Sequence, residues 1–256
     1  MYEIQKIITT KYVVILLCLA TYLQLSCAHR SGHRRDRERP GSVMIDRSDR
    51  NSSRSNSRGN KIVNQRSSDK LEGSQIFDRY GNAVFMIFTS DGENGFQGSG
   101  FFINSTGLAV SNYHVFKGTY KGLEQIKLPN EDVAYKIKNV IAKSEDEDFI
   151  LFTIDCRGAV PYIPVAKTRP SVGEKVFAIG SPRGLENTFS SGEVSQWRDK
   201  NLMQISAQID HGSSGGALIN AYGEVVGITS GTFYDGSQAN LNYAWSIDVI
   251  KKYLKN

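Results

Sequence analysis

The stretch QIDHGSSGGALIN, residues 208–220, places glycines on both sides of a serine pair and then runs into apolar residues. A loop between two strands would produce this pattern, because Gly and Ser punctuate turns. A chemical interpretation takes Ser214 as a nucleophile, with glycines that let backbone N–H groups approach the charge formed during the reaction. That interpretation requires a histidine and a carboxylate from other parts of the chain.

Residues 72–256 contain two histidines, His114 and His211. His114 ends an apolar hairpin pattern, and a strand end gives a catalytic base a rigid, half-exposed position. His211 lies only three residues before Ser214, which is too close along the chain for an easy approach to the hydroxyl. A lone histidine at a strand end is more often an ordinary core or surface residue, so His114 is a candidate only together with its partners.

The orienting carboxylate is expected just before the apolar run FILFTI at 149–154. Asp148 is the last acid before that run, whereas Asp146 and Glu147 are expected to be more exposed. An acid in this place is usually a solvated turn residue, and only the combination of three residues favours a catalytic role. The resulting order His114, Asp148, Ser214 is that of the chymotrypsin-like double barrel among triad hydrolases.

Short apolar or alternating runs separated by Gly, Asn and Asp turns predict an all-β domain after residue 72. At the end, Ile247, Ile250 and Leu254 follow a helical spacing, with Asp248 near the start and lysines near the end, so a C-terminal helix is expected. The predicted strands are 83–89, 98–104, 107–112, 133–142, 149–154, 174–181, 190–197, 202–208, 216–220, 224–231 and 241–247.

Four segments carry a more specific pattern: GSGFFINSTGLAVSNYHVFKG (98–118), DFILFTI (148–154), SVGEKVFAIGSPRGLENTFSSGEVS (171–195) and QIDHGSSGGALIN (208–220). In this order they resemble the motifs of the HtrA-type (Do-like) serine proteases of the trypsin-like superfamily. The resemblance covers residues 76–254 and implies a chymotrypsin-like double six-stranded β-barrel. Ser213 and His211 depart from the Asn and Pro that the family often has there.

The resemblance also implies site residues. The backbone N–H groups of Gly212 and Ser214 would form the oxyanion hole, and Gln208, Thr229, Ser230 and Gly231 would bind the residue before the cut. None of these side chains is charged, which favours a small or medium apolar residue over Lys or Arg. Ser213 has no charge to receive a new N-terminus, so activation of the trypsin zymogen type is not expected.

Charge and cysteine content limit the other functions. Residues 28–71 hold 12 Lys and Arg against 5 Asp and Glu, whereas residues 72–256 hold 17 against 20. The basic character therefore belongs to the N-terminal part and does not indicate a nucleic-acid-binding domain. Of three cysteines, only Cys156 lies after residue 72, and no Cys/His cluster suggests zinc. We expect no metal, no cofactor and no specific nucleic-acid partner.

Residues 1–27 have two lysines before an apolar run at 12–25, the pattern of an export signal and short for a membrane span. The ending LQLSC resembles a bacterial lipobox, which makes Cys27 a candidate for lipidation. Simple cleavage near Ala28 and an uncleaved anchor are the alternatives. The protein is thus expected to be exported to the bacterial cell envelope, lipid-anchored or secreted, with the N-terminus as its means of membrane attachment.

Residues 28–71 are rich in Arg and Ser and lack aromatic residues, so they bury too little apolar area to offset the entropy of ordering. We expect a disordered basic tether. Contact with anionic lipid head groups or nucleic acid is one role for such a tether, and a solvated spacer is the plainer interpretation.

The expected function is therefore that of a serine endopeptidase, with residues 72–256 as the protease domain and unfolded or exported proteins as substrates. Many HtrA-type proteins carry a PDZ domain after this region, and none is expected within this sequence. A catalytically idle trypsin-fold binding module is the main alternative, and a basic membrane- or nucleic-acid-binding protein acting through 28–71 is another. Oligomerisation is compatible with all three.

Overall fold

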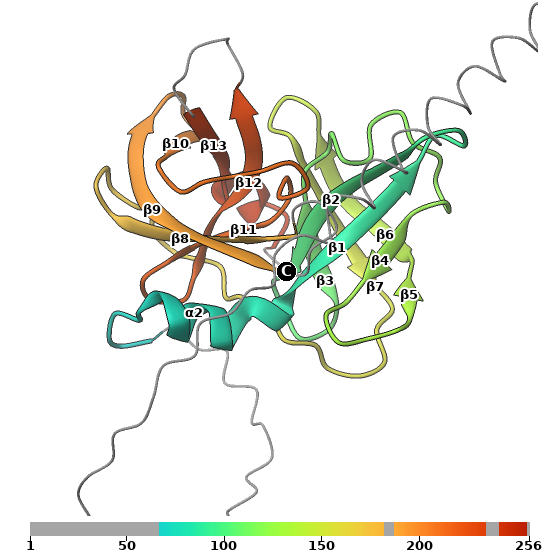
Figure 1. Cartoon of the computed structure of the whole chain (residues 1–256), viewed down its shortest axis with the longest axis horizontal. Coiled ribbons are helices and arrows are strands. Elements are labelled where there is room, and N and C mark those ends of the chain that lie inside the picture. The colour runs from blue at the N-terminus through green and yellow to red at the C-terminus, as the bar shows by residue number, and fades with distance from the viewer. Residues whose placement is uncertain (1–66, 182–186, 234–240, 255–256) are drawn as a thin grey trace, which may run out of the picture. The chain divides into compact units, whose positions relative to one another are not determined.

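The computed structural model describes residues 67–181, 187–233 and 241–254, which form two β units (Figure 1). The first unit is a sheet made of β1 (Val84–Ser90), β2 (Gly95–Phe102), β3 (Leu108–Ser111), β4 (Gln125–Lys127), β5 (Ala134–Tyr135), β6 (Ile137–Ser144) and β7 (Phe149–Ile154). The second unit is a barrel made of β8 (Lys175–Gly180), β9 (Thr188–Trp197), β10 (Leu202–Ile205), β11 (Ala217–Asn220), β12 (Val225–Phe233) and β13 (Leu241–Ser246).

The strand pairing confirms the expected all-β, chymotrypsin-like architecture, with one difference. The second unit is a closed six-stranded barrel in the order β10-β13-β12-β11-β8-β9. The first is a seven-stranded sheet in the order β5-β4-β1-β2-β3-β7-β6, in which the described strands form no closing pair. The three-residue strand β4 was not predicted, because it has no apolar run long enough to reveal it in sequence. The single strand predicted at 133–142 is divided into the two-residue β5 and the longer β6.

Alternation along the strands divides the apolar side chains among three cores. In β7, Phe149 and Leu151 belong to a central core shared by the two units, while Ile150 and Phe152 belong to a core inside the first sheet. In the same way β8 sends Phe177 into the central core and Val176 into the barrel interior. Strands buried on both faces read as continuous apolar runs. The central core fixes the two units against each other, and the expected nucleophile Ser214 and the expected base His114 come from different units.

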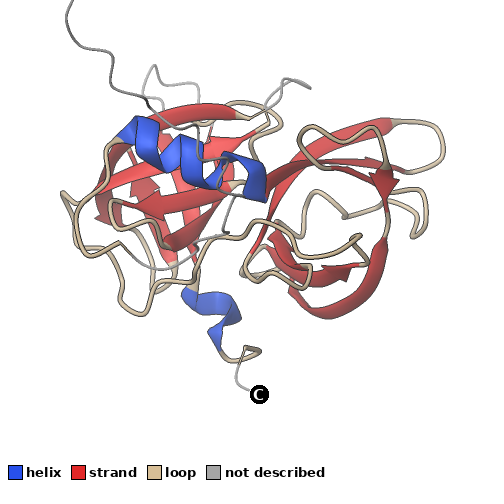
Figure 2. Ribbon diagram, turned by 90° about the horizontal axis from the view of Figure 1, so that it is seen from below, coloured by secondary structure: helices blue, strands red, loops and turns tan. Residues whose placement is uncertain are grey.

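A helix that the sequence analysis did not predict, α2 (Gly73–Tyr80), precedes the first sheet. It begins with a capping box between Glu72 and Gln75, buries Ile76 and Tyr80, and packs Phe77 edge-to-face on Phe189 of β9 at 6.0 Å. Figure 2 shows α2 lying across the barrel rather than the first sheet. The short 3₁₀ helix η1 (Gly81–Ala83) then leads into β1.

The folded domain begins earlier than residue 72. The N–H of Ser67 donates to the carbonyl of Tyr222 at 3.0 Å, and the N–H of Leu71 donates to that of Ala221 at 2.7 Å. Leu71 is buried in the central core. The last residues of the range expected to be a tether are therefore part of the domain, while residues 1–66, including Cys27, lie outside the described residues.

The C-terminal helix is present but shorter than expected. α3 (Asp248–Lys251) buries Val249 and Ile250 in the central core. The chain then continues in turns, with the Leu254 N–H donating to the Lys251 carbonyl at 3.2 Å. Across the described parts of the chain, no helix has the length and apolar character needed to cross a membrane.

Candidate active site

His114 and Asp148 meet because their strands are neighbours. β3 pairs with β7 antiparallel, with Ser111 opposite Ile150, so the residues after β3 lie beside those before β7. His114 Nδ1 lies 2.8 Å from Asp148 Oδ2, and the His114 backbone N–H donates to Asp148 Oδ1 at 2.9 Å. The histidine side chain is 44% exposed and the aspartate 14%. The carboxylate therefore holds the imidazole at one nitrogen and leaves its other side open to solvent.

Asp148 is itself held in an unusual conformation. Its φ of 43° lies in the left-handed region, which Asp enters more readily than most residues. The fully buried Asn112 donates from Nδ2 to the Asp148 carbonyl at 2.8 Å, and Ser230 Oγ donates to Asp148 Oδ2 at 2.8 Å. Neither role was predicted. The Asn two residues before His114 was the available signal for the first, whereas the second joins residues 82 positions apart.

Ser214 lies in a tight loop that leads into β11. Within this loop the Ser213 N–H donates to the Asp210 carbonyl at 2.9 Å, and the Gly216 N–H donates to the Ser213 carbonyl at 2.9 Å. Ser214 Oγ donates to the Ser230 carbonyl at 3.3 Å, and among the described residues no hydrogen bond joins it to His114. Ser214 thus shares a pocket with His114, with its hydroxyl turned toward β12.

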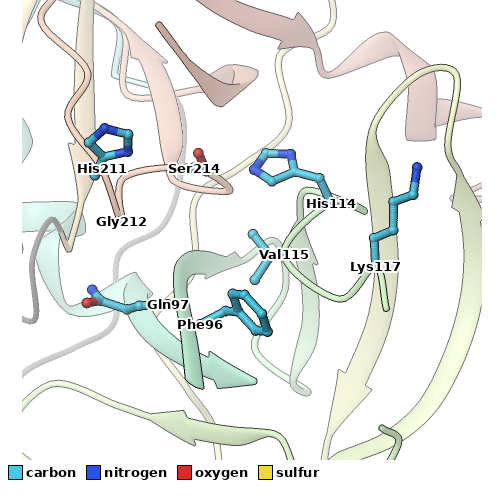
Figure 3. A pocket seen from close by; sticks show the side chains of 8 residues that line it. All are labelled: Phe96, Gln97, His114, Val115, Lys117, His211, Gly212 and Ser214. Carbon is cyan, nitrogen blue, oxygen red and sulfur yellow. The ribbon is translucent and has the colours of Figure 1, made fainter. Parts of the chain in front are cut away.

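A pocket of about 450 Å³ brings the two residues together. Figure 3 shows the His114 imidazole directed toward Ser214, with Phe96 and Gln97 of β2 below them and His211 beyond the serine. The pocket is lined by Phe96, Gln97, His114, Val115, Lys117, His211, Gly212 and Ser214. The expected base His114, the expected nucleophile Ser214 and the expected oxyanion residue Gly212 therefore share a single solvent-open site.

Lys117 forms the edge of this pocket. Its Nζ donates to the carboxylate of Glu145, and this hydrogen bond, with the charge of Glu145, raises the pKa of the Lys117 ammonium. The pocket edge therefore carries a compensated ion pair.

The backbone around Ser214 is suited to binding an oxyanion. The Ser213 carbonyl accepts hydrogen bonds from Thr229 Oγ1 at 2.7 Å and from the Gly216 N–H. Because a peptide is planar and trans, this fixes the Ser214 N–H in the opposite direction. Gly212 has a φ of +94°, which glycine adopts without strain. Neither the Gly212 nor the Ser214 N–H donates to another described residue, so both are free for a substrate oxygen.

The four residues expected to bind substrate have different roles. The expectation for the Thr229 side chain is corrected, because it is only 1% exposed and donates to the Ser213 carbonyl. Ser230 supports Asp148, as described above. Gln208 is exposed, and its carbonyl accepts from Ser190 Oγ at 2.7 Å. Gly231 lies beside the nucleophile, since a Cβ there would be 3.6 Å from Ser214 Oγ. None of the four lines the pocket of Figure 3.

No group of three or more Cys, His, Asp or Glu side chains in the described ranges is arranged to hold a metal ion.

The family model of the trypsin-like peptidase domain matches residues 98–228. The chain belongs to this family. This trypsin-like domain is of the HtrA type: it is 32% identical over 171 residues to the serine protease HTRA1 of Xenopus tropicalis, an alignment covering 61% of this chain and 35% of that protein. It is 31% identical over 145 residues to the serine endoprotease DegS of Salmonella typhimurium, covering 53% and 40%.

A solved structure of similar fold supports the same assignment. The crystal structure of the serine endoprotease from Yersinia pestis has a TM-score of 0.63 at 25% identity, covering 72% of this chain and 66% of that one. The HtrA-type domain described here spans 35–40% of the length of the two relatives named above.

Proposed function

We propose that this HtrA-type domain is a serine endopeptidase that uses Ser214, His114 and Asp148. The observation that carries the proposal is the pairing of His114 with Asp148 through both the imidazole and the backbone N–H, in a pocket shared with Ser214. The names of the relatives, a serine protease and a serine endoprotease, favour internal cleavage of proteins.

The chemistry begins with a rotation of Ser214 Oγ from the Ser230 carbonyl toward His114 Nε2. The hydroxyl oxygen attacks the substrate carbonyl and its proton passes to Nε2, while Asp148 stabilises the imidazolium through Nδ1. His114 then protonates the leaving amine as the C–N bond breaks, which gives an acyl-enzyme. Water attacks the acyl group, returns its proton through His114 and releases the acid product. The Gly212 and Ser214 N–H groups stabilise the oxyanion in both halves of the reaction.

The substrates follow from the site and from the N-terminal segment. Because His114 protonates the leaving amine, the pocket beside it, with Phe96 and Val115, holds the substrate residues after the cut. Gln208 and Gly231 are themselves uncharged, which favours a small or medium apolar residue before the cut over Lys or Arg. Residues 1–27 have the pattern of an export signal, so we propose unfolded or exported proteins of the cell envelope as substrates.

Labelling with a fluorophosphonate probe tests the proposal directly. The wild-type chain is expected to label at one serine, and labelling is expected to disappear in both Ser214→Ala and His114→Ala. Cleavage of denatured casein should be lost in the same two variants.

A folded wild-type chain that neither labels nor cleaves casein would contradict the proposal. The idle binding module, for which the hydrogen bond from Ser214 to Ser230 is the favouring observation, would then be the better interpretation.

A further inference from the structure

Ser99 is a fully buried serine of β2 whose hydroxyl has two partners outside its own sheet. Its Oγ donates to the Gly212 carbonyl at 2.7 Å and accepts the Ser181 N–H at 2.9 Å. Ser181 follows β8, and its carbonyl accepts from Gln97 Nε2 at 2.5 Å. One hydroxyl of the first sheet therefore joins the end of β8 to the loop that carries the nucleophile.

The bond to Gly212 acts on one particular peptide group. The Gly212 carbonyl and the Ser213 N–H belong to the same plane. The carbonyl is held by Ser99 Oγ and the N–H by the Asp210 carbonyl at 2.9 Å. This peptide lies between the two expected oxyanion donors, the N–H groups of Gly212 and Ser214. A displacement of this peptide would move the Cα atoms of Gly212 and Ser213, to which the two peptides that carry the donors are joined, and glycine at 212 permits such movement.

A backbone contact of Ser99 distinguishes this role of the hydroxyl from simple attachment of the loop. The Ser99 backbone N–H donates to the Ser214 carbonyl at 2.7 Å. That hydrogen bond does not involve the side chain, so it survives when the hydroxyl is removed. A variant without the hydroxyl keeps the loop docked on β2 but leaves the part-buried Gly212 carbonyl and the buried Ser181 N–H without their partner.

We propose that Ser99 is a positioning residue of the oxyanion hole, which fixes the Gly212–Ser213 peptide through its hydroxyl. The inference rests on the proposed function. It assigns to Ser99 a share of transition-state stabilisation without any contact to the substrate. Because the effect is confined to the donors, binding of the substrate chain itself is unaffected.

The test compares Ser99→Ala with Ser246→Ala in the full chain. Ser246 is an equally buried serine of β13 whose Oγ accepts the Asp248 N–H at 3.3 Å, away from the nucleophile loop. With fluorescein-labelled casein, kcat of Ser99→Ala is expected to fall about 10- to 100-fold, with KM within about twofold of wild type. The rate of fluorophosphonate labelling should fall in parallel, while Ser246→Ala keeps wild-type values.

Hydrogen exchange gives a readout that does not depend on turnover. Amides of residues 208–216 are expected to exchange faster in Ser99→Ala than in wild type. In Ser246→Ala the same amides are expected to exchange at the wild-type rate. If the wild-type protein neither labels nor cleaves casein, the proposed function fails. Hydrogen exchange at residues 208–216 then decides by itself whether the Ser99 hydroxyl holds the loop. A kcat of Ser99→Ala within twofold of Ser246→Ala, or unchanged exchange at 208–216, would overturn the inference.

A second variant covers the case in which Ser99→Ala does not fold. Ser99→Cys keeps a side chain of similar shape with a weaker hydrogen-bond donor. The kcat of Ser99→Cys is expected to lie between that of wild type and the value expected for Ser99→Ala. A wild-type kcat in Ser99→Cys would contradict the proposal.

Discussion

The side chain of Asn112 donates a hydrogen bond of 2.8 Å to the backbone carbonyl of Asp148, and so links the chain just before His114 to the aspartate that pairs with it. Asp148 has a positive φ, a conformation that a non-glycine residue retains only when its surroundings hold it. The Asn112 Oδ1 atom is buried without a hydrogen-bond partner among the described residues. The protein thus retains an unpaired buried acceptor in exchange for the donor that holds Asp148.

Asn112→Ala is expected to reduce kcat by at least about 10-fold, because small misplacements of a catalytic group cost rate steeply. The loss of stability should be near the lower end of about 1–3 kcal/mol, since the substitution also removes the unpaired acceptor. Steady-state kinetics and urea denaturation measure the two effects. Asn82→Ala, at an exposed asparagine of η1, is the control, and equal kinetics in the two variants would contradict the assignment.

Asp148→Asn is expected to lower kcat by about 10⁴-fold, because an amide in this place does not hold the imidazole in the required tautomer. The fold should remain, since the side chain keeps its size and its other contacts. Asp146→Asn changes a neighbouring exposed acid and should leave kcat unchanged. Similar kinetics in the two variants would show that Asp148 does not orient the base.

Gly215→Ala is expected to prevent formation of the nucleophile loop. Gly215 has a φ of +87°, and a Cβ there would meet the Ser99 carbonyl oxygen and Ser111 Oγ. Gly118→Ala measures the cost of the backbone conformation alone, because Gly118 has a φ of +75° and an added Cβ would have open space around it. Thermal or urea unfolding should show a loss of about 1–2 kcal/mol for Gly118→Ala and of about 4 kcal/mol or more for Gly215→Ala. Equal losses of unfolding free energy in the two variants would show that the close contacts of a Cβ at Gly215 do not destabilise the domain.

Asp248 should make the domain sensitive to acid. Burial raises its pKa, but hydrogen bonds from Lys251 and Arg169 outweigh this and leave the pKa below its ordinary value. A carboxylate with a lowered pKa contributes stability above the pKa of the unfolded chain, about 3.9, and this contribution is lost as pH falls through the folded-state pKa.

Asp248→Asn is therefore expected to be less stable than wild type at pH 7, with the difference shrinking below pH 4. Urea denaturation across this range measures it. Asp78→Asn, at an exposed position of α2, should show no such dependence, and a constant difference for Asp248→Asn would contradict the assignment.

Cys156 is expected to be a poor nucleophile in the folded domain. Burial raises the pKa of its thiol to about 11, and the charges of Glu131 and Asp155 add to the effect. Because only the thiolate reacts, alkylation by iodoacetamide at pH 8 should be on the order of 100-fold slower in the native protein than in urea. Peptide mapping separates this site from the other two cysteines, and equal native and denatured rates would contradict the prediction.

Strands that are buried on both faces could be predicted from the sequence. β7 and β8 are buried on both faces, so their apolar runs stand out, and the Asp148 segment adjoins β7. The Ser214 segment leads into β11, another mostly buried strand. The helix α2 was missed because only Ile76 and Tyr80 are buried in its eight residues, although its capping pair was visible. α3 was predicted too long because periodicity shows which residues face the core but not where helical hydrogen bonds stop.

The site was predictable to the level of residue types in order along the chain. Contacts between distant segments were not, because nothing local in the sequence reports them. Ser230 on Asp148, Ser99 on Gly212 and Thr229 on Ser213 each join residues at least 16 positions apart. Short polar side chains such as these read as ordinary strand residues until the register of the sheets is known.

Under the proposed function, the division of Ser214 from His114 and Asp148 between the two β units makes the protein separable into complementary halves. A cut within residues 155–174 would place His114 and Asp148 on one fragment and Ser214 on the other, so neither fragment alone could hydrolyse a peptide. The α2 segment would stay with the first fragment and still pack on the barrel of the second, which favours reassembly. Fused to two interacting proteins, such fragments would regain activity only when brought together, and the domain would report proximity through proteolysis.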